Sequence, residues 1–168
     1  AMMQLPKRRW IRWMLQLAAV VLLLALLHAY NTRGTPRGQA PEISGQLLDG
    51  TSVSLHAMRG APVLLHFWAT WCPICGITQA TVAAIAADYP VLSVAMDDAS
   101  PEQILAYMKD HGVDYPVIHD PDYNIARRYG IRGVPSSFIL DAGGNIRFVA
   151  SGYTTNPGLR LRLWWAGR

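Results

Sequence analysis

The longest uncharged stretch of the chain sets the strongest limit on how it can fold. Residues 13–30 (WMLQLAAVVLLLALLHAY) contain no Asp, Glu, Lys or Arg. A helix that spans a bilayer needs roughly 17–25 predominantly apolar residues, so this stretch is long enough to cross one. Trp10, Trp13 and Tyr30 lie near its ends, where aromatic side chains commonly occupy the membrane interface. We therefore expect a single transmembrane helix over residues 13–30.

Two other interpretations of the stretch stay open. A secretory signal peptide has the same order of charged and apolar segments, but its cleavage site needs small residues. Residues 26–30 (LLHAY) offer no clean A-x-A pattern. A buried core helix would usually carry polar residues along one face, and only Gln16 and His28 interrupt the apolar run. An uncleaved anchor is the interpretation we favour.

The positive charge of the chain is concentrated before and just after this stretch. Residues 1–40 hold six Lys or Arg and no acid, whereas residues 41–168 hold nine Lys or Arg and eleven Asp or Glu. By the positive-inside rule, the basic residues of segment 1–12 keep it in the cytoplasm and the rest is exported. We expect a single-pass inner-membrane protein whose domain faces the periplasm. The domain is mildly acidic, so the high pI does not indicate nucleic-acid binding.

Composition limits the class of the remaining chain. Residues 31–41 (NTRGTPRGQAP) are polar with Gly and Pro, and predict a short flexible linker before a domain at 42–168. Hydrophobic residues make up 51% and charged residues 15% of the chain. This balance excludes disorder as the dominant state. With 2 cysteines, the chain is neither a disulfide-dense scaffold nor a four-cysteine zinc protein.

The order of predicted elements after the linker indicates an α/β domain. Strands that alternate with helices imply parallel crossovers, and two strands near the end form an antiparallel pair. The predicted elements are a hairpin at 43–55 around Asp49-Gly50, strands at 63–68, 91–96 and 115–118, helices at 78–89, 101–111, 122–129 and 156–165, and a second hairpin with strands 137–140 and 146–149. These elements predict a central mixed sheet flanked by helices.

The segment Cys72-Pro73-Ile74-Cys75 follows a predicted buried strand and opens a helix. The thiolate is the reactive form of cysteine, and the positive end of a helix favours it. We expect Cys72 to be the exposed attacking thiol and Cys75 to be more buried and to resolve the mixed disulfide. Pro73 suits an early helical position, where its missing N–H costs little.

Three other roles for the cysteine pair fit less well. A zinc clip needs two more ligands, and no second CxxC or HxxxH is present. Covalent haem attachment needs a His after the second Cys, where Gly76 stands. A structural disulfide across so short a loop would add little stability. We predict a redox-active pair that uses neither a metal nor a small-molecule cofactor.

Two segments of the chain resemble a known superfamily. Residues 67–75 (FWATWCPIC) are similar to the active-site motif of thioredoxins, and residues 133–138 (GVPSSF) to their cis-proline segment. With the anchor and the first hairpin, the chain resembles membrane-anchored TlpA/ResA-type thiol–disulfide oxidoreductases, including the short suppressor-of-copper-sensitivity type. The resemblance implies a thioredoxin-like fold with an N-terminal β-hairpin and a membrane protein that resupplies electrons.

The same resemblance implies how substrate would bind. Pro135 would be cis and lie against Cys72, and the backbone around Val134 would pair with a substrate peptide as an added strand. The residues that we expect to border the substrate are Trp71, Pro73, Ile74, Val134 and Pro135. An ordinary trans turn before a strand is the alternative interpretation of this segment.

The chain departs from the thioredoxin pattern at two positions. His66 stands where thioredoxins hold a buried Asp, and it could accept the proton of Cys75. A neutral His bonded to backbone is the alternative. Thr78 stands where many TlpA/ResA-type proteins that serve cytochrome c maturation carry Glu, which puts such a role in doubt.

Two further groups have uncertain roles in the sequence. Asp97-Asp98 either ends a strand in solvent or lies at the rim of the active site. Trp164-Trp165 is expected to pack the terminal helix onto the sheet.

These features together predict a periplasm-facing, membrane-tethered oxidoreductase that exchanges disulfides with protein substrates and works as a reductase. Two alternatives are kept. The same chemistry can run backwards as an oxidase of protein thiols, because direction depends on reduction potential. A metallochaperone linked to copper tolerance could bind Cu(I) through both thiolates, since soft ligands suit this ion.

Overall fold

The computed structural model describes residues 7–31 and 34–168, and the chain divides into two units at Arg33/Gly34. The first unit contains helix α1 (Lys7–Asn31). Its segment Trp10–Leu27 is long and apolar enough to cross a membrane, and none of that segment is buried in protein. The second unit, from Gly34 onward, carries the cysteine pair.

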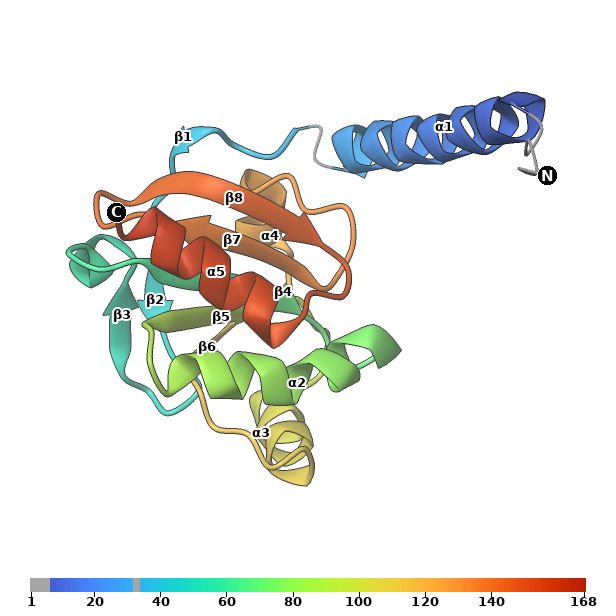
Figure 1. The fold of residues 1–168 in the computed structure, drawn as a ribbon. Coiled ribbons are helices and arrows are strands. Elements are labelled where there is room, and N and C mark those ends of the chain that lie inside the picture. Colours follow the sequence, from blue (N-terminus) through green and yellow to red (C-terminus); the bar gives the residue numbers. More distant parts are fainter. Residues whose placement is uncertain (1–6, 32–33) are drawn as a thin grey trace. The chain divides into compact units, whose positions relative to one another are not determined.

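A six-stranded mixed sheet forms the centre of the domain, in the order β1-β8-β7-β4-β5-β6 (Figure 1). Strands β4, β5 and β6 run parallel to one another, and β7, β8 and β1 continue the sheet in antiparallel pairs. The strand bounds are β1 Gly38–Gln39, β4 Val63–Trp68, β5 Val91–Ala95, β6 Val117–His119, β7 Ser136–Leu140 and β8 Asn145–Ser151. The mixed sheet is the one predicted from the alternating pattern.

The predicted first hairpin is present beside the main sheet. Strands β2 (Ser44–Gln46) and β3 (Ser52–Ser54) pair around the Asp-Gly turn, and a 3-10 turn η1 (His56–Met58) follows. Leu47 forms an antiparallel bridge with Ile118 of β6. The hairpin therefore protects part of the sheet edge at β6, an edge that would otherwise be open to pairing.

Helices cover both faces of the sheet, and β4 contributes to two cores. Helices α2 (Pro73–Ala86), α3 (Pro101–Asp110) and α5 (Asn156–Ala166) pack over the face that holds Leu64 and Trp68. The short helix α4 (Asn124–Arg128) packs on the opposite face with Leu65 and Phe67. Figure 1 shows α2 and α5 on one side of the sheet and α4 on the other. All six β4 residues are buried, as their continuous apolar run predicted.

The expected flexible linker at 31–41 is wrong in its second half. Gly38 and Gln39 form β1 against β8, and the Ala40 N–H donates to the Gly144 carbonyl at 2.9 Å. Residues 32–33 of that linker lie outside the described residues. The polar segment is ordered because it covers the open edge of β8, a backbone requirement that leaves no hydrophobic pattern in the sequence.

The expected packing of Trp164-Trp165 is also wrong. Helix α5 buries Leu159, Leu163 and Ala166 against the sheet. The neighbouring tryptophans point away from this face, and Trp164 is 47% and Trp165 60% exposed. Helical periodicity places Leu159 and Leu163 on one face, so both tryptophans cannot share it.

Candidate active site

The cysteine pair lies where β4 leads into α2. Cys72 is the N-cap of α2, and its Sγ accepts the Cys75 N–H at 3.2 Å. Pro73 occupies the first turn, where a backbone N–H has no helical partner. An N–H donor and the positive end of a helix suit a sulfur that must carry negative charge when it attacks. Cys72 therefore lies at a helix N-terminus, as the sequence predicted.

The expected exposure of Cys72 is wrong. Cys72 is only 5% exposed and Cys75 is fully buried. The Cys72 thiol donates to the Val134 carbonyl at 3.5 Å, so the loop before β7 covers it. Any group that reacts with Sγ must first displace this contact.

The Cys75 thiol is held in its protonated form. Burial raises the pKa of Cys75 well above its usual value, and the hydrogen bond with Cys72 raises it further. A protonated thiol is a poor nucleophile. Attack by Cys75 therefore requires a group that removes its proton.

The Val134–Pro135 peptide bond is cis, as expected from the thioredoxin resemblance. The loop is fixed on both sides, because the Ser136 hydroxyl donates to the Gly133 carbonyl at 2.7 Å and the Gly152 N–H donates to the Pro135 carbonyl at 2.7 Å. Through the Val134 carbonyl the loop lies directly against Cys72.

His66 is buried in the middle of β4. Its Nδ1 lies 2.9 Å from the Ser137 hydroxyl on β7, so a side chain and not the backbone is its partner. Burial lowers the pKa of His66 to about 4, and the imidazole is neutral at pH 7. His66 lies on the sheet face of Leu64 and Trp68, the face that α2 covers.

Asp97 has a role that the sequence left open. It is buried at the end of β5, and its Oδ2 accepts the Thr70 N–H at 2.5 Å and the Thr70 hydroxyl at 2.7 Å. Its Oδ1 accepts the Ala99 N–H at 2.9 Å. The carboxylate therefore ties β5 to the loop that precedes Cys72. The signal in the sequence was an acid directly after a parallel strand, at the edge where such strands end.

An aromatic group on α3 packs against the first turns of α2, and sequence reasoning missed it. Tyr107 stacks on Trp68 with ring centroids 5.6 Å apart, and His111 packs on Tyr107 at 4.1 Å. A Cβ at Gly76 would lie 3.3 Å from the Tyr107 hydroxyl and from His111 Nε2. Burial raises the pKa of Tyr107, and its hydrogen bond with Gln79 partly opposes this rise. The glycine after Cys75 thus lets α3 approach the cysteine pair.

Gln79 extends this group one turn beyond Cys75. It is buried, and its Oε1 accepts the Tyr115 hydroxyl. Within the described residues, its Nε2 has no hydrogen-bond partner. The role of Gln79 was not predicted, because a single polar residue in an alanine-rich helix carries no signal of its partner.

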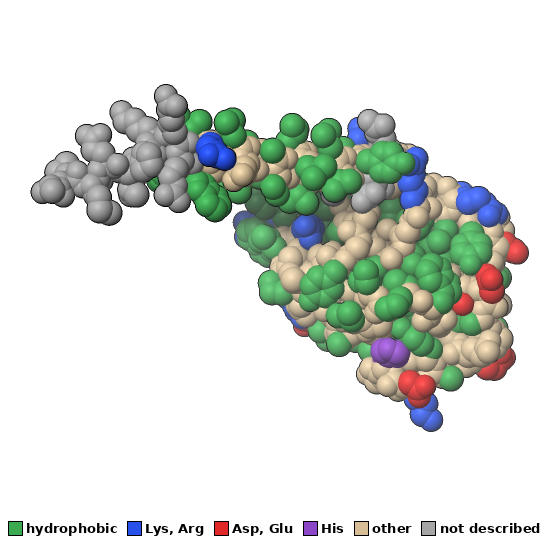
Figure 2. Space-filling model, turned by 90° about the vertical axis from the view of Figure 1, so that its right-hand side faces the viewer, with side chains coloured by type: hydrophobic (Ala, Val, Ile, Leu, Met, Phe, Trp, Pro, Cys, Tyr) green, Lys and Arg blue, Asp and Glu red, His purple; other side chains and the backbone are tan. Residues whose placement is uncertain are grey.

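Large apolar side chains are exposed close to Cys72 in the chain. Trp71 is 62%, Ile74 45% and Ile77 67% exposed. Ile74 and Ile77 are three residues apart in α2 and share one side of the helix, and Trp71 directly precedes the N-cap Cys72. Figure 2 views the side of the domain on which α2 begins, and hydrophobic side chains spread across it. The predicted residues Trp71 and Ile74 are thus exposed near Cys72, and Ile77 adds to this apolar surface.

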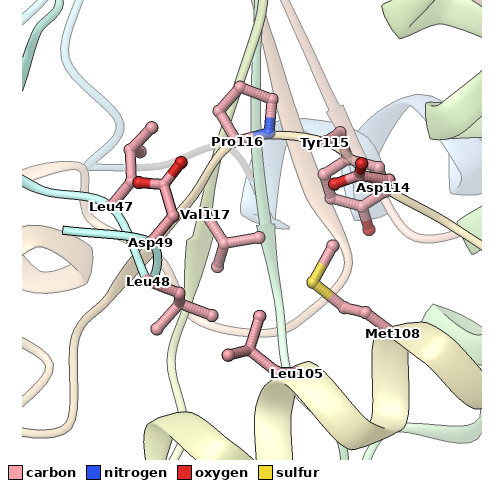
Figure 3. A pocket seen from close by; sticks show the side chains of 9 residues that line it. All are labelled: Leu47, Leu48, Asp49, Leu105, Met108, Asp114, Tyr115, Pro116 and Val117. Atoms are coloured by element: carbon pink, nitrogen blue, oxygen red, sulfur yellow. The ribbon is translucent and has the colours of Figure 1, made fainter. Parts of the chain in front are cut away.

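A separate cavity of about 300 Å³ lies between the first hairpin, α3 and β6 (Figure 3). Leucine, methionine and valine side chains line it, with Asp49 and Asp114 among them. Neither cysteine lines this cavity. Within residues 7–31 and 34–168, no group of three or more His, Cys, Asp or Glu side chains is placed to hold a metal ion.

Comparison with known sequences gives a consistent set of relatives. Residues 36–149 match the model of the AhpC/TSA family. A thioredoxin-like protein of Haemophilus influenzae is 31% identical over 127 residues, which cover 74% of this chain and 75% of the relative. A thiol:disulfide interchange protein DsbE of Allochromatium vinosum is 33% identical over 141 residues, which cover 76% and 77%. The thiol–disulfide oxidoreductase ResA of Halalkalibacterium halodurans is 29% identical over 112 residues, 64% of each chain.

Solved structures share the fold. A putative thiol:disulfide interchange protein DsbE from Chlorobium tepidum has a TM-score of 0.71 and 24% identity, with 79% of this chain and 99% of that chain covered. A putative thioredoxin from Neisseria meningitidis has a TM-score of 0.69 and 26% identity, with 78% and 91% covered. The names of these relatives give no support to the narrower likeness to the suppressor-of-copper-sensitivity type.

Proposed function

Since the chain belongs to the AhpC/TSA family and is a thiol–disulfide oxidoreductase of the DsbE/ResA type, we propose that Cys72 and Cys75 are its reactive pair. One observation carries this assignment. The Cys72 sulfur lies between the Cys75 N–H and the Val134 carbonyl of the cis-proline loop. A single sulfur is thereby placed at a helix N-terminus and beside backbone that a peptide could pair with.

The reaction we propose transfers two electrons to a protein disulfide. The Cys72 thiolate attacks one substrate sulfur, the substrate S–S bond breaks, and the second substrate sulfur leaves as a thiolate and takes a proton. Cys75 then loses its proton and attacks Cys72 Sγ, the mixed disulfide breaks, and the first substrate sulfur leaves as a thiolate and takes a proton. The products are a substrate dithiol and a Cys72–Cys75 disulfide, which a membrane thiol-transfer protein would reduce again.

His66 is our proposed proton acceptor for Cys75. Its imidazole is unprotonated at pH 7, the form that can accept a proton during the reaction, and it lies on the sheet face that α2 covers. The hydrogen bond to Ser137 fixes the ring. Asp97 acts as a positioning residue, because it fixes the loop before Cys72 through Thr70.

Substrate docking is assigned to the apolar opening around Cys72. Trp71, Ile74 and Ile77 offer exposed apolar area, and the Val134 backbone offers the strand-like contact. A protein segment with apolar side chains next to a disulfide fits this opening.

The decisive experiment captures the mixed disulfide. Cys75→Ala should trap substrate on Cys72 through a bond that dithiothreitol releases, while Cys72→Ala should trap nothing. Insulin reduction, assayed beside titration with Cu(I), separates disulfide exchange from metal delivery. Copper binding tighter than micromolar without thiol exchange would overturn the assignment in favour of the metallochaperone.

The reducing direction follows the TlpA/ResA resemblance, and equilibration with glutathione buffers tests it. A reduction potential near that of thioredoxin supports a reductase, and one near that of DsbA makes the protein an oxidase.

Helix α1 is assigned as the anchor that holds the domain at the periplasmic side of the inner membrane. Its segment Trp10–Leu27 has the length and composition of a span, and basic residues precede or begin it. Carbonate extraction of membranes, with protease treatment of spheroplasts, checks both parts. Full release by carbonate would reject the anchor, and protection of the domain in spheroplasts would reject the orientation.

A further inference from the structure

The outward side of α5 carries an unusual combination of side chains, which we call the α5 outer surface. It consists of Leu161, Arg162, Trp164, Trp165 and Arg168. Leu161 is 61%, Trp164 47% and Trp165 60% exposed. Exposed large apolar groups that gather in one place mark an interaction site more often than scattered ones do.

The charge of this surface is positive. Residues 156–168 contain three arginines and no Asp or Glu. Arg160 is paired with Asp88 at 2.6 Å, whereas Arg162 and Arg168 form no ion pair within residues 34–168. The Arg168 guanidinium lies 4.0 Å from the centre of the Trp164 ring. Arg168 therefore stacks on an exposed indole, and Arg162, whose Nη1 donates to the Gly158 carbonyl at 3.5 Å, adds a second cation to the same helix.

This chemistry fits a lipid surface. Tryptophan favours the headgroup level of a bilayer, and arginine is attracted to anionic headgroups. A helix with basic and aromatic residues on its outer side lies in the interface plane, and its affinity depends on both.

The short connection between the two units also favours a lipid surface as the partner of the α5 outer surface. Only residues 28–33 separate the span ending at Leu27 from Gly34, the first residue of the domain unit. Fully extended, this connection reaches at most about 25 Å. A domain tethered so closely meets a lipid surface at high effective concentration.

We propose that the α5 outer surface docks the domain onto the anionic lipid surface beside its own anchor. This inference rests on the proposed anchoring by α1. Gly167 lies against Pro62, just before β4, while Cys72 follows the other end of that strand. The two sites are therefore at opposite ends of β4, and docking leaves the cysteine pair accessible.

The test uses residues 34–168, which contain both cores of the domain. Residues 34–168 form a compact unit separate from α1, so we expect this domain to fold without the helix. Sedimentation with vesicles of phosphatidylcholine and phosphatidylglycerol (3:1) should show binding that vesicles of pure phosphatidylcholine do not. R162Q/R168Q should weaken binding about 25-fold, since each basic residue contributes about fivefold at an anionic surface. W164A/W165A should weaken it at least about tenfold.

Trp71→Ala is the matched control, because it removes a tryptophan of similar exposure at the opposite end of β4. It should bind vesicles as the parent does. Equal loss in the control, or binding that ignores phosphatidylglycerol, overturns the proposal. Dimerisation of the parent that W164A/W165A abolishes, without vesicle binding, would assign the surface to a second copy and also overturn it.

Insulin reduction by the same α5 variants should stay within twofold of the parent, with or without vesicles. Loss of lipid binding with intact exchange separates this inference from the proposed function of the cysteine pair. Carbonate extraction of the full chain reports separately on α1.

Discussion

The start of α2 and the outward side of α5 both expose tryptophan and aliphatic side chains, yet they surround different chemistry. Trp71, Ile74 and Ile77 are exposed near the almost buried sulfur of Cys72. Trp164 and Trp165 border arginines and no reactive group. Exposed apolar area therefore does not define a function by itself. The chemical groups beside it do: a cysteine sulfur at the start of α2, and guanidinium groups on α5.

The supporting contacts of the two regions differ as well. The loop before Cys72 is held by the buried Asp97 carboxylate, and the loop that covers the thiol by Ser136 and Gly152. Helix α5 is held by the apolar contacts of Leu159, Leu163 and Ala166 and by Arg160, which pairs with Asp88 and donates to the Ala84 carbonyl. Redox chemistry needs a fixed sulfur, whereas a docking surface needs only accessible area.

Removal of the attacking thiol should give the largest contrast between the regions. Cys72→Ser should lower the rate of insulin reduction by at least about 1,000-fold, because the only other cysteine of the chain, Cys75, is fully buried. W164A/W165A should leave that rate within twofold. A comparable loss in both variants would mean that the two regions act as one site.

The pH dependence of stability should come next in size. The His66 pKa of about 4 lies below the value of about 6.5 expected in the unfolded chain, so the unfolded state binds the extra proton first. The stability that the neutral, buried His66 contributes to the folded state is complete above about pH 6.5. It is lost as the pH falls towards about 4. We expect His66 to lower the free energy of unfolding by about 2–3 kcal/mol between pH 7 and 4.5.

Urea titration of the parent and of His66→Asn at both pH values measures this effect, with His111→Asn as the control for an exposed imidazole. A pH dependence that persists unchanged in His66→Asn would contradict it. Single-turnover kinetics of the same variant test the proton role, because an acceptor for Cys75 must slow release of the mixed disulfide when it is removed.

Asp97→Asn should have an intermediate effect that is confined to the region around Cys72 at the start of α2. The amide keeps the volume but weakens the bonds to Thr70, which are bonds to a charged group. We expect a loss of about 1–2 kcal/mol in stability and about tenfold in exchange rate. Asp98→Asn is the matched control at the neighbouring position. Equal effects of the two substitutions would remove Asp97 from its positioning role.

The smallest effect should come from a single apolar side chain at the opening. Ile77→Ala should raise KM for a protein disulfide about three- to tenfold with little change in kcat, since it removes docking area of about 1 kcal/mol. Leu161→Ala, an exposed aliphatic residue on α5, should leave KM unchanged. A fall in kcat for Ile77→Ala would place this side chain in the chemical step.

Much of the fold could be predicted because its signals are local. The apolar run of β4, the Asp-Gly turn of the first hairpin and the N-cap serine with Pro101 before α3 each act within a few residues. The placement of Cys72 at a helix N-terminus followed from the same kind of signal. The strand β1 could not be predicted, because Gly38 and Gln39 are ordered by pairing with β8 and not by their own pattern.

The sequence by itself determined the element order, the separation of a basic apolar segment from a mildly acidic domain, and the choice of Cys72 and Cys75 as the candidate reactive pair. Periodicity, capping and charge act locally and are visible in the order of residues. Only the tertiary structure decided that the Val134 carbonyl covers Cys72 and that Asp97 holds the loop before Cys72. It also decided that Tyr107 lies close to Gly76 and that Trp164 and Trp165 face outward. These outcomes depend on which distant strands and helices come together, and that choice is made by packing the whole sheet.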